Sequence, residues 1–158
     1  MTKALSSIAL ALICAAPLTA RGQLIDTKVV SLEAAKTMVA AAEAEAKKHS
    51  WTMAIAIVDA SGTLILFHRM DDVQTGSVDV AMAKAKTAAL FRRPTQALAD
   101  ALKNGNQGVL SLPGATAIAG GVPITVNGKV IGAVGCSGMA SDQDAAVAQA
   151  GVDALGAH

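Results

Sequence analysis

The stretch "VPITVNGKVIGAVGCSG", residues 122–138, decides how this chain folds. Two apolar runs flank the dipeptide Asn127-Gly128. Because this dipeptide readily adopts the positive φ angles of a type I′ turn, it is the strongest short-range sequence signal for a hairpin. We therefore predict two antiparallel strands joined at Asn127 and Gly128.

A glycine-rich break follows the hairpin and leads into a helix expected from Ser141 to about Leu155. Ser141 and Asp144 resemble a capping box at its start. Such a junction offers backbone N–H groups and the positive end of a helix dipole to an anion. Alternatively, Gly135 and Gly138 serve only to let a strand turn sharply into a helix. The chain has no GxGxxG ahead of this helix and no GKS or GKT, so the sequence does not indicate nucleotide binding.

A second hairpin and three more helices are predicted upstream. The hairpin joins two β-prone runs through the turn residues Ala60, Ser61 and Gly62. The expected elements, in chain order, are a helix over residues 32–48, strands over 53–59 and 63–70, and helices over 78–90 and 95–104. Residues 108–121 are rich in glycine and alanine and are expected to be mostly loop.

The two hairpins determine the predicted fold class. Each forces neighbouring strands to run antiparallel, whereas a parallel sheet needs long crossover connections. The order helix, hairpin, two helices, hairpin, helix therefore predicts an α/β (α+β) single domain with one antiparallel sheet flanked by helices. A length of 158 residues fits one hydrophobic core.

Composition excludes some partners. A net charge of +1 with 16% charged residues does not suggest a surface that grips nucleic acid or an anionic membrane. Aromatic residues make up 2% of the chain and tyrosine is absent, so platforms for stacking bases are nearly excluded. We expect no nucleic-acid partner.

The N-terminus, "MTKALSSIALALICAAPLTARGQ", has the pattern of a secretory signal peptide over residues 1–22. Lys3 precedes an apolar run that is shorter than the ~20 residues of a membrane-spanning helix. We therefore expect a mature domain over residues 23–158, periplasmic or secreted, without stable membrane insertion after cleavage. Removal of Cys14 leaves Cys136 alone, so no intramolecular disulfide can form. A buried, inert thiol is the favoured interpretation of Cys136, against metal ligation or a disulfide between subunits.

The segment "FHRMDD" contains the main candidate ligands. On a strand, His68 and Met70 project to one face, and Arg69 and Asp71 to the other. Histidine and methionine can both bind haem iron, and His68 with Asp71 or Asp72 could instead hold a metal ion. The competing interpretation is a solvated strand end.

Basic side chains could face the carboxylates of a ligand. They cluster at Lys84, Lys86, Arg92 and Arg93, and the fold could bring Arg69 close to them. Lys84 and Lys86 diverge on a helix because they are two positions apart. Such a cluster can bind ligand carboxylates, or can serve solubility alone. His49 closes the first predicted helix, where capping by the imidazole competes with a ligand role.

Three blocks together resemble the GlcG/HbpS family, also called the haem-degrading domain family. They are "WTMAIAIVDASGTLILFHRMDD", "KAKTAALFRRPT" and "GGVPITVNGKVIGAVGCSGMASDQDAAVAQAG", and the resemblance extends over residues 32–155. It implies a profilin-like fold with a five-stranded antiparallel sheet between helices. It also implies haem or a related tetrapyrrole as cofactor and, for some members, export and assembly into homo-oligomers. Other members occur beside glycolate-utilisation genes.

The chain departs from this family at one position. Many members carry histidine after the paired glycine of the first hairpin turn, where this chain has Thr63. His68, Met70 and His49 are therefore chosen as possible haem ligands on the chemistry of their side chains. No set of residues forms a catalytic constellation by itself, so any enzymatic activity would depend on bound haem.

Three functions remain open at this point. The first is an exported haem-binding protein that serves haem or iron sensing, carriage or protection. The second is a haem-degrading enzyme or a glycolate-utilisation accessory protein. The third is an oligomeric interaction or sensing module.

Overall fold

The computed structural model describes residues 22–156. Nearly all of the expected signal peptide, residues 1–21, lies outside the described part. The elements are α1 (Leu32–Lys48), β1 (Ala54–Asp59), β2 (Leu64–Arg69), α2 (Ser77–Phe91), α3 (Thr95–Lys103), the 3₁₀ helix η1 (Gln107–Ser111), β3 (Gly121–Val126), β4 (Lys129–Ser137) and α4 (Ser141–Asp153). Within the described residues, no helix is long and apolar enough to cross a membrane.

The strands form one antiparallel sheet in the order β2-β1-β4-β3. Both predicted hairpins are present, and β1 pairs with β4 to join them. The described residues form four strands, so the five strands implied by the family resemblance are a wrong prediction for this chain. The glycine- and proline-containing segment between α3 and β3 forms η1 and turns instead of a further strand.

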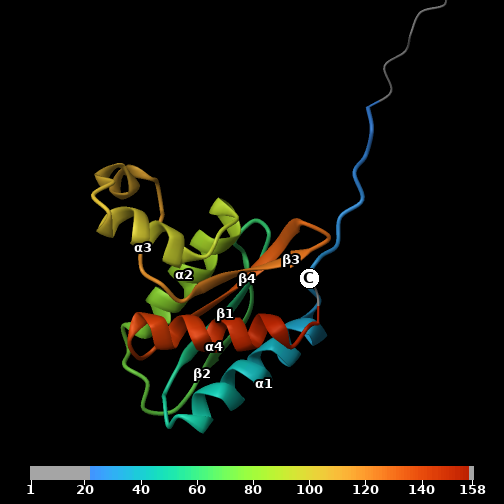
Figure 1. Cartoon of the computed structure of the whole chain (residues 1–158). Coiled ribbons are helices and arrows are strands. Elements are labelled where there is room, and N and C mark those ends of the chain that lie inside the picture. The colour runs from blue at the N-terminus through green and yellow to red at the C-terminus, as the bar shows by residue number, and fades with distance from the viewer. Residues whose placement is uncertain (1–21, 157–158) are drawn as a thin grey trace, which may run out of the picture.

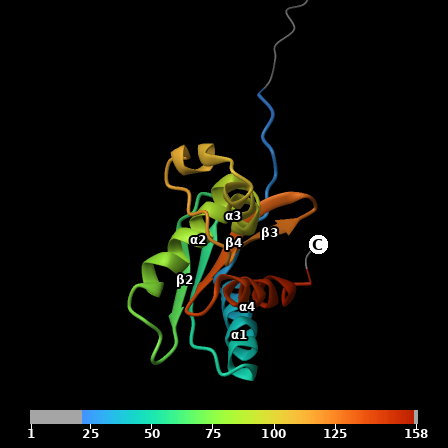
Figure 2. The same cartoon turned by 60° about the vertical axis from the view of Figure 1, so that its left-hand side comes forward.

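Helices cover both faces of the sheet. In Figure 1, α1 and α4 lie together on one side, and Figure 2 shows α2 on the opposite side. The fold class is therefore the predicted one. The period-2 alternation of β1 divides its side chains between the two faces: Ile55 and Ile57 pack with the α1/α4 layer, and Ala54 and Ala56 with α2.

The face toward α1 and α4 is filled by large aliphatic side chains. Ser31 is the N-cap of α1, since its hydroxyl oxygen accepts a hydrogen bond from the Ala34 N–H at 3.1 Å. The apolar stripe of α1 then packs on the sheet, with Met38 fully buried. Cys136 is buried in the same layer, and burial raises the pKa of its thiol. The prediction of a buried cysteine is thus confirmed.

The face toward α2 is packed on glycine and alanine. A Cβ added to Gly135 of β4 would collide with the carbonyl oxygen of Ala81 and the nitrogen of Ala85. Because these are backbone atoms of α2, the helix lies directly against the strand. Glycine at this position is required by the close approach of two backbones and not by an unusual φ angle.

The start of α4 differs from the prediction. Ala140 is the N-cap, and the Gln143 side-chain oxygen accepts a hydrogen bond from the Ala140 N–H at 3.1 Å. The predicted capping box of Ser141 with Asp144 is therefore wrong. Asp144 is 2% exposed and points into the protein, where it has another partner.

Candidate functional site

The end of β2 and the last turns of α1 form a shallow pocket of about 290 Å³. Three of the residues predicted as ligand contacts, His68, Arg69 and Met70, lie together there. The lining is completed by Glu43, Lys47 and Asp71. Because His68 pairs in register with Ile55, it lies on the α1/α4 face of the sheet.

One ring nitrogen of His68 is buried without a hydrogen-bond partner. Nε2 lies 3.4 Å from Oε2 of Glu43, but the arrangement of the two groups does not make a hydrogen bond. Glu43 is held instead by Lys47, whose Nζ lies 2.6 Å from Oε1. The hydrogen bond from Lys47 holds the pKa of the Glu43 carboxyl below its ordinary value, and the nearby His68 adds to this effect.

A buried nitrogen that makes no hydrogen bond is a group that a ligand or metal would satisfy. Within residues 22–156, no three His, Cys, Asp or Glu side chains gather to hold a metal ion. A bare ion bound at His68 would therefore lack the ligands of a closed protein site. Haem needs only axial ligands from the protein, so one histidine beside a methionine fits it better.

His49 lies outside this pocket. It is the C-cap residue of α1, and its ring stacks on Trp51 with centroids 4.3 Å apart. Its Nε2 lies 3.2 Å from the Glu45 carboxylate. These contacts agree with the capping interpretation of His49.

The basic residues do not form one surface. Arg69 lies at the His68 pocket, whereas Arg92 lines a different pocket beside Lys129. Arg93 is exposed and donates a hydrogen bond from Nε to the Phe91 carbonyl. Lys84 is 1% exposed, so it is not part of a solvent-facing basic rim as the sequence suggested.

Lys84 instead forms a buried ion pair that sequence reasoning missed. Its Nζ lies 2.6 Å from Oδ2 of Asp144 and donates a second hydrogen bond to the Cys136 carbonyl at 3.2 Å. The other carboxylate oxygen of Asp144 accepts from the Met139 N–H at 3.0 Å. Burial raises the pKa of Asp144, and the bond from Lys84 opposes this rise. Gly120, with φ +124°, covers the pair, since a Cβ there would lie 2.8 Å from Nζ.

This ion pair explains the glycine-rich junction after β4. Asp144 ties the first turn of α4 to the backbone of the break and, through Lys84, to α2. Gly138 approaches the Thr52 carbonyl so closely that a Cβ would collide with it. Close backbone contacts therefore account for Gly135 and Gly138, and no anion site is needed to explain these glycines.

Fold and pocket together define a single-domain α/β protein with a shallow pocket that contains a histidine and a methionine. The chain belongs to the HbpS-like family, since the family model described as "Haem degrading protein HbpS-like" matches residues 30–153. The family predicted from the sequence blocks is thus confirmed.

Three relatives place the chain within this family. It is 41% identical to Protein GlcG of Escherichia coli K12 over 112 residues, which cover 70% of this chain and 84% of GlcG. Its structure is similar to that of a Streptomyces reticuli HbpS double mutant, with 34% identity, a TM-score of 0.78 and coverage of 89% and 97% of the two chains. It is also similar to PduOC in a complex with haem, with 28% identity, a TM-score of 0.77 and coverage of 83% and 98%.

Proposed function

We propose that this protein is an exported haem-binding protein that takes the tetrapyrrole at the His68 pocket. The observation that carries the proposal is the buried Nε2 of His68, which makes no hydrogen bond and lies in the same pocket as Met70, in a member of this family. The similarity to PduOC, whose structure is a complex with haem, supports the same ligand class.

Each residue of the pocket has a part in this proposal. His68 offers an imidazole to the iron, and Met70 offers a thioether and apolar contact. Arg69 is a cation at the rim that can bind a propionate carboxylate, whereas Lys47 is already paired with Glu43. When bound, haem would supply a redox-active iron, while the protein chain supplies binding, orientation and shielding.

The small size of the pocket supports a further proposal, that a second copy of the chain completes the site. At about 290 Å³ it lies at the lower limit of the ~300–1,000 Å³ typical of pockets that enclose a small ligand. One chain can therefore enclose only part of a macrocycle. We propose that a homo-oligomer covers the rest of the ring, with the His68 pocket at a subunit contact.

Haem titration into the apoprotein tests the proposal. We expect a saturable Soret shift, and His68→Ala should weaken binding by about tenfold or more, since an iron ligand is lost. His49→Ala is the matched control, because it removes a histidine outside the pocket and should leave the spectrum unchanged. A His68→Ala protein with the original spectrum and affinity would remove this residue from the role.

Export has its own test. Sequencing the N-terminus of protein recovered from the envelope or medium should show a chain that begins after residue 20 or 22. An intact residue 1 on protein retained in the cytoplasm would contradict export.

Haem degradation is the second candidate function, and the family description favours it. Incubation of the haem-loaded protein with a reductant in air should, in that case, bleach the Soret band and give an open-chain tetrapyrrole. Recovery of unchanged haem would favour sensing or carriage over turnover.

A further inference from the structure

Ion pairs are distributed unevenly over the molecule. On α1, Lys36, Lys47 and Lys48 each lie 2.6–2.8 Å from a glutamate. At the end of the sheet that carries both hairpin turns, the cations are free. Lys28, Lys86, Arg92 and Lys129 have no carboxylate within 4.0 Å among the described residues 22–156.

A pocket of about 520 Å³ lies at this cationic end. It forms between the two hairpin turns, the end of α2 and the extended N-terminal segment. Arg92 and Lys129 supply its positive charges, while Ile25, Ala60 and Val130 supply apolar walls. Among the described residues 22–156, no acidic side chain lines it, and Asp26 lines the hollow that adjoins it.

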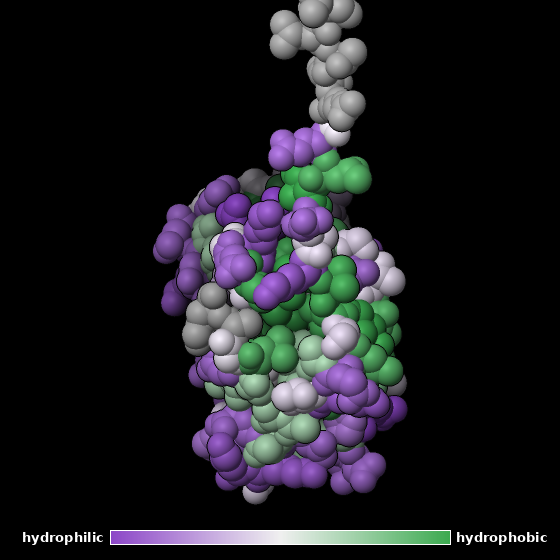
Figure 3. Space-filling model, turned by 90° about the vertical axis from the view of Figure 1, so that its right-hand side faces the viewer, coloured by the Kyte–Doolittle hydropathy of each residue, from purple (hydrophilic) through white to green (hydrophobic). Residues whose placement is uncertain are grey.

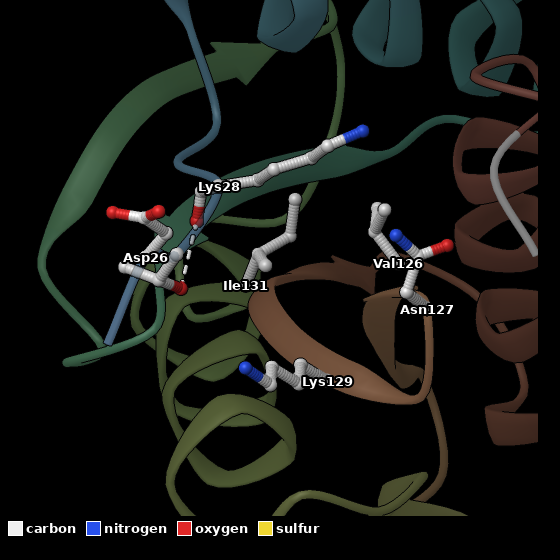
Figure 4. Close-up of a pocket in the computed structure, with 7 residues that line it drawn as sticks. Asp26, Lys28, Val126, Asn127, Lys129 and Ile131 are labelled. Carbon is white, nitrogen blue, oxygen red and sulfur yellow. Dashed lines mark hydrogen bonds between the residues drawn. The ribbon is translucent and has the colours of Figure 1, made fainter.

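A second hollow adjoins the pocket beside the N-terminal segment. Figure 4 shows the adjoining hollow, which shares Thr27 and Lys129 with it, and in that view Lys28 and Lys129 lie on either side of Ile131. Figure 3 shows this face of the molecule, with hydrophilic side chains gathered just below the N-terminal segment and an apolar area directly beneath them. Hydrophilic and apolar surface therefore adjoin here, and the charged side chains that line the adjoining hollow are Lys28, Lys129 and Asp26.

The backbone conformation places Arg92 and Lys129 next to the two hairpin turns. Arg92 ends α2 with φ +53°, an uncommon conformation for a residue other than glycine. Lys129 follows directly after the turn at Asn127 and Gly128, whose φ angles are +51° and +73°. The stem of Lys86 crosses the other turn, since a Cβ on Gly62 would lie 2.9 Å from Lys86 Cγ.

We propose that this pocket binds a small organic carboxylate with an apolar body. Arginine matches a carboxylate through two parallel N–H donors, and Lys129 adds a second charge. The apolar walls favour a ligand with a hydrocarbon part over inorganic anions. The site lies apart from the His68 pocket and does not depend on haem.

Hexanoate is the probe for this site, and hexan-1-ol and hexylammonium have the same apolar body without the negative charge. In ¹H–¹⁵N spectra of the exported protein, hexanoate should give saturable shifts at the amides of Ala60 and Gly128. The alcohol should bind several-fold more weakly, and the amine should give no saturable shift. Equal binding of hexanoate and hexan-1-ol, or no saturable shift with hexanoate, would overturn the proposal.

Variants locate the binding to the two cations. Arg92→Gln with Lys129→Gln should weaken hexanoate binding by about tenfold or more, because two charge-assisted contacts are lost. Arg93→Gln with Lys103→Gln removes the same charge outside the pocket and should leave the affinity unchanged. An equal loss in both double variants would reveal a general charge effect and contradict the site. If the first pair unfolds the protein, Lys129→Gln alone should weaken binding several-fold.

Haem titration separates this proposal from the previous one. Haem affinity should be the same in the Arg92→Gln, Lys129→Gln protein as in the unmodified chain. A parallel loss of haem and hexanoate binding would mean that the cations hold the propionates, and an independent carboxylate site would be excluded. Failure of haem binding alone would leave the hexanoate result standing.

Discussion

The two faces of the sheet are built on opposite principles. Toward α1 and α4, bulky side chains such as Met38, Met53 and Ile57 fill the space. Toward α2, glycine and alanine bring backbone against backbone, and a lysine and an aspartate are buried at the margin. The α1/α4 face is stabilised by burial of apolar area. The α2 face depends on close contact between the backbones of α2 and β4 and on the ion pair between Lys84 and Asp144.

The two faces should differ in how well they tolerate substitutions. A face filled by flexible side chains can partly repack around a smaller residue, so its losses are graded. A face where two backbones touch has no side chain that can move aside. Adding a methyl group on the α2 face should therefore lower the free energy of unfolding far more than removing a methyl group from the α1/α4 face.

The largest effect is expected from Gly135→Val. The new Cβ would collide with backbone atoms of Ala81 and Ala85, so the variant should lose about 4 kcal/mol or more of unfolding free energy. Urea denaturation measures this. Gly76→Ala is the control, since nothing lies within 4 Å of its added Cβ and its change should stay within about 0.5 kcal/mol. An unchanged midpoint for Gly135→Val would show that α2 can withdraw from β4 at little cost.

Lys84→Met should have the next largest effect. It leaves the Asp144 carboxylate buried without its partner, a change that costs about 3–5 kcal/mol in other proteins. Replacing both, with Lys84→Met and Asp144→Leu, should recover much of the loss because no buried charge remains. A double-mutant cycle in urea gives the coupling. Additive losses would show that the two side chains act independently despite their 2.6 Å separation.

A smaller and graded loss is expected on the α1/α4 face. Met38→Ala removes a fully buried side chain and should cost about 3 kcal/mol, within the range of such truncations. Ile57→Val, which removes one methyl group, should cost about 1 kcal/mol. The order of the two unfolding midpoints checks the prediction. A cost for Ile57→Val as large as that for Gly135→Val would abolish the contrast between the faces.

The smallest effect concerns pH and the turn that sets the β1–β2 register. Hydrogen bonds from the Ser61 hydroxyl and the Thr63 N–H hold the pKa of Asp59 below its ordinary value. Its folded pKa is thus below its unfolded pKa, so this stability is present above about pH 4 and is lost as the pH falls through the folded pKa.

Asp59→Asn should therefore flatten the acid limb of the stability curve and leave Met38 and Gly135 packing intact. Urea midpoints measured from neutral to acid pH check this. An unchanged slope in the acid range would show that Asp59 does not contribute to it.

Local sequence signals predicted the local structure. The Asn127-Gly128 turn and the helix over residues 32–48 appear as expected, because neighbours along the chain determine both. The Lys84–Asp144 pair was missed because its members are 60 residues apart. A signal existed, since Lys84 lies on the same helical stripe as the buried Ala81 and Ala88.

The candidate site was predicted only in part. His68 and Met70 were found from their shared strand face, and the pocket contains both. Glu43 and Lys47 could not be assigned to it, because the crossing of α1 over the end of β2 is a tertiary contact. The separation of Arg69 and Arg92 into two different pockets also depends on tertiary contacts, so it could not be predicted from the sequence.

The position of Cys136 gives the protein a built-in reporter. Its sulfur is sealed beneath α1 and α4, so an alkylating reagent can reach it only after those helices leave the sheet. The rate of thiol modification would then count spontaneous openings of the molecule. An oxidant would likewise be kept from the Cys136 thiol while the protein stays closed.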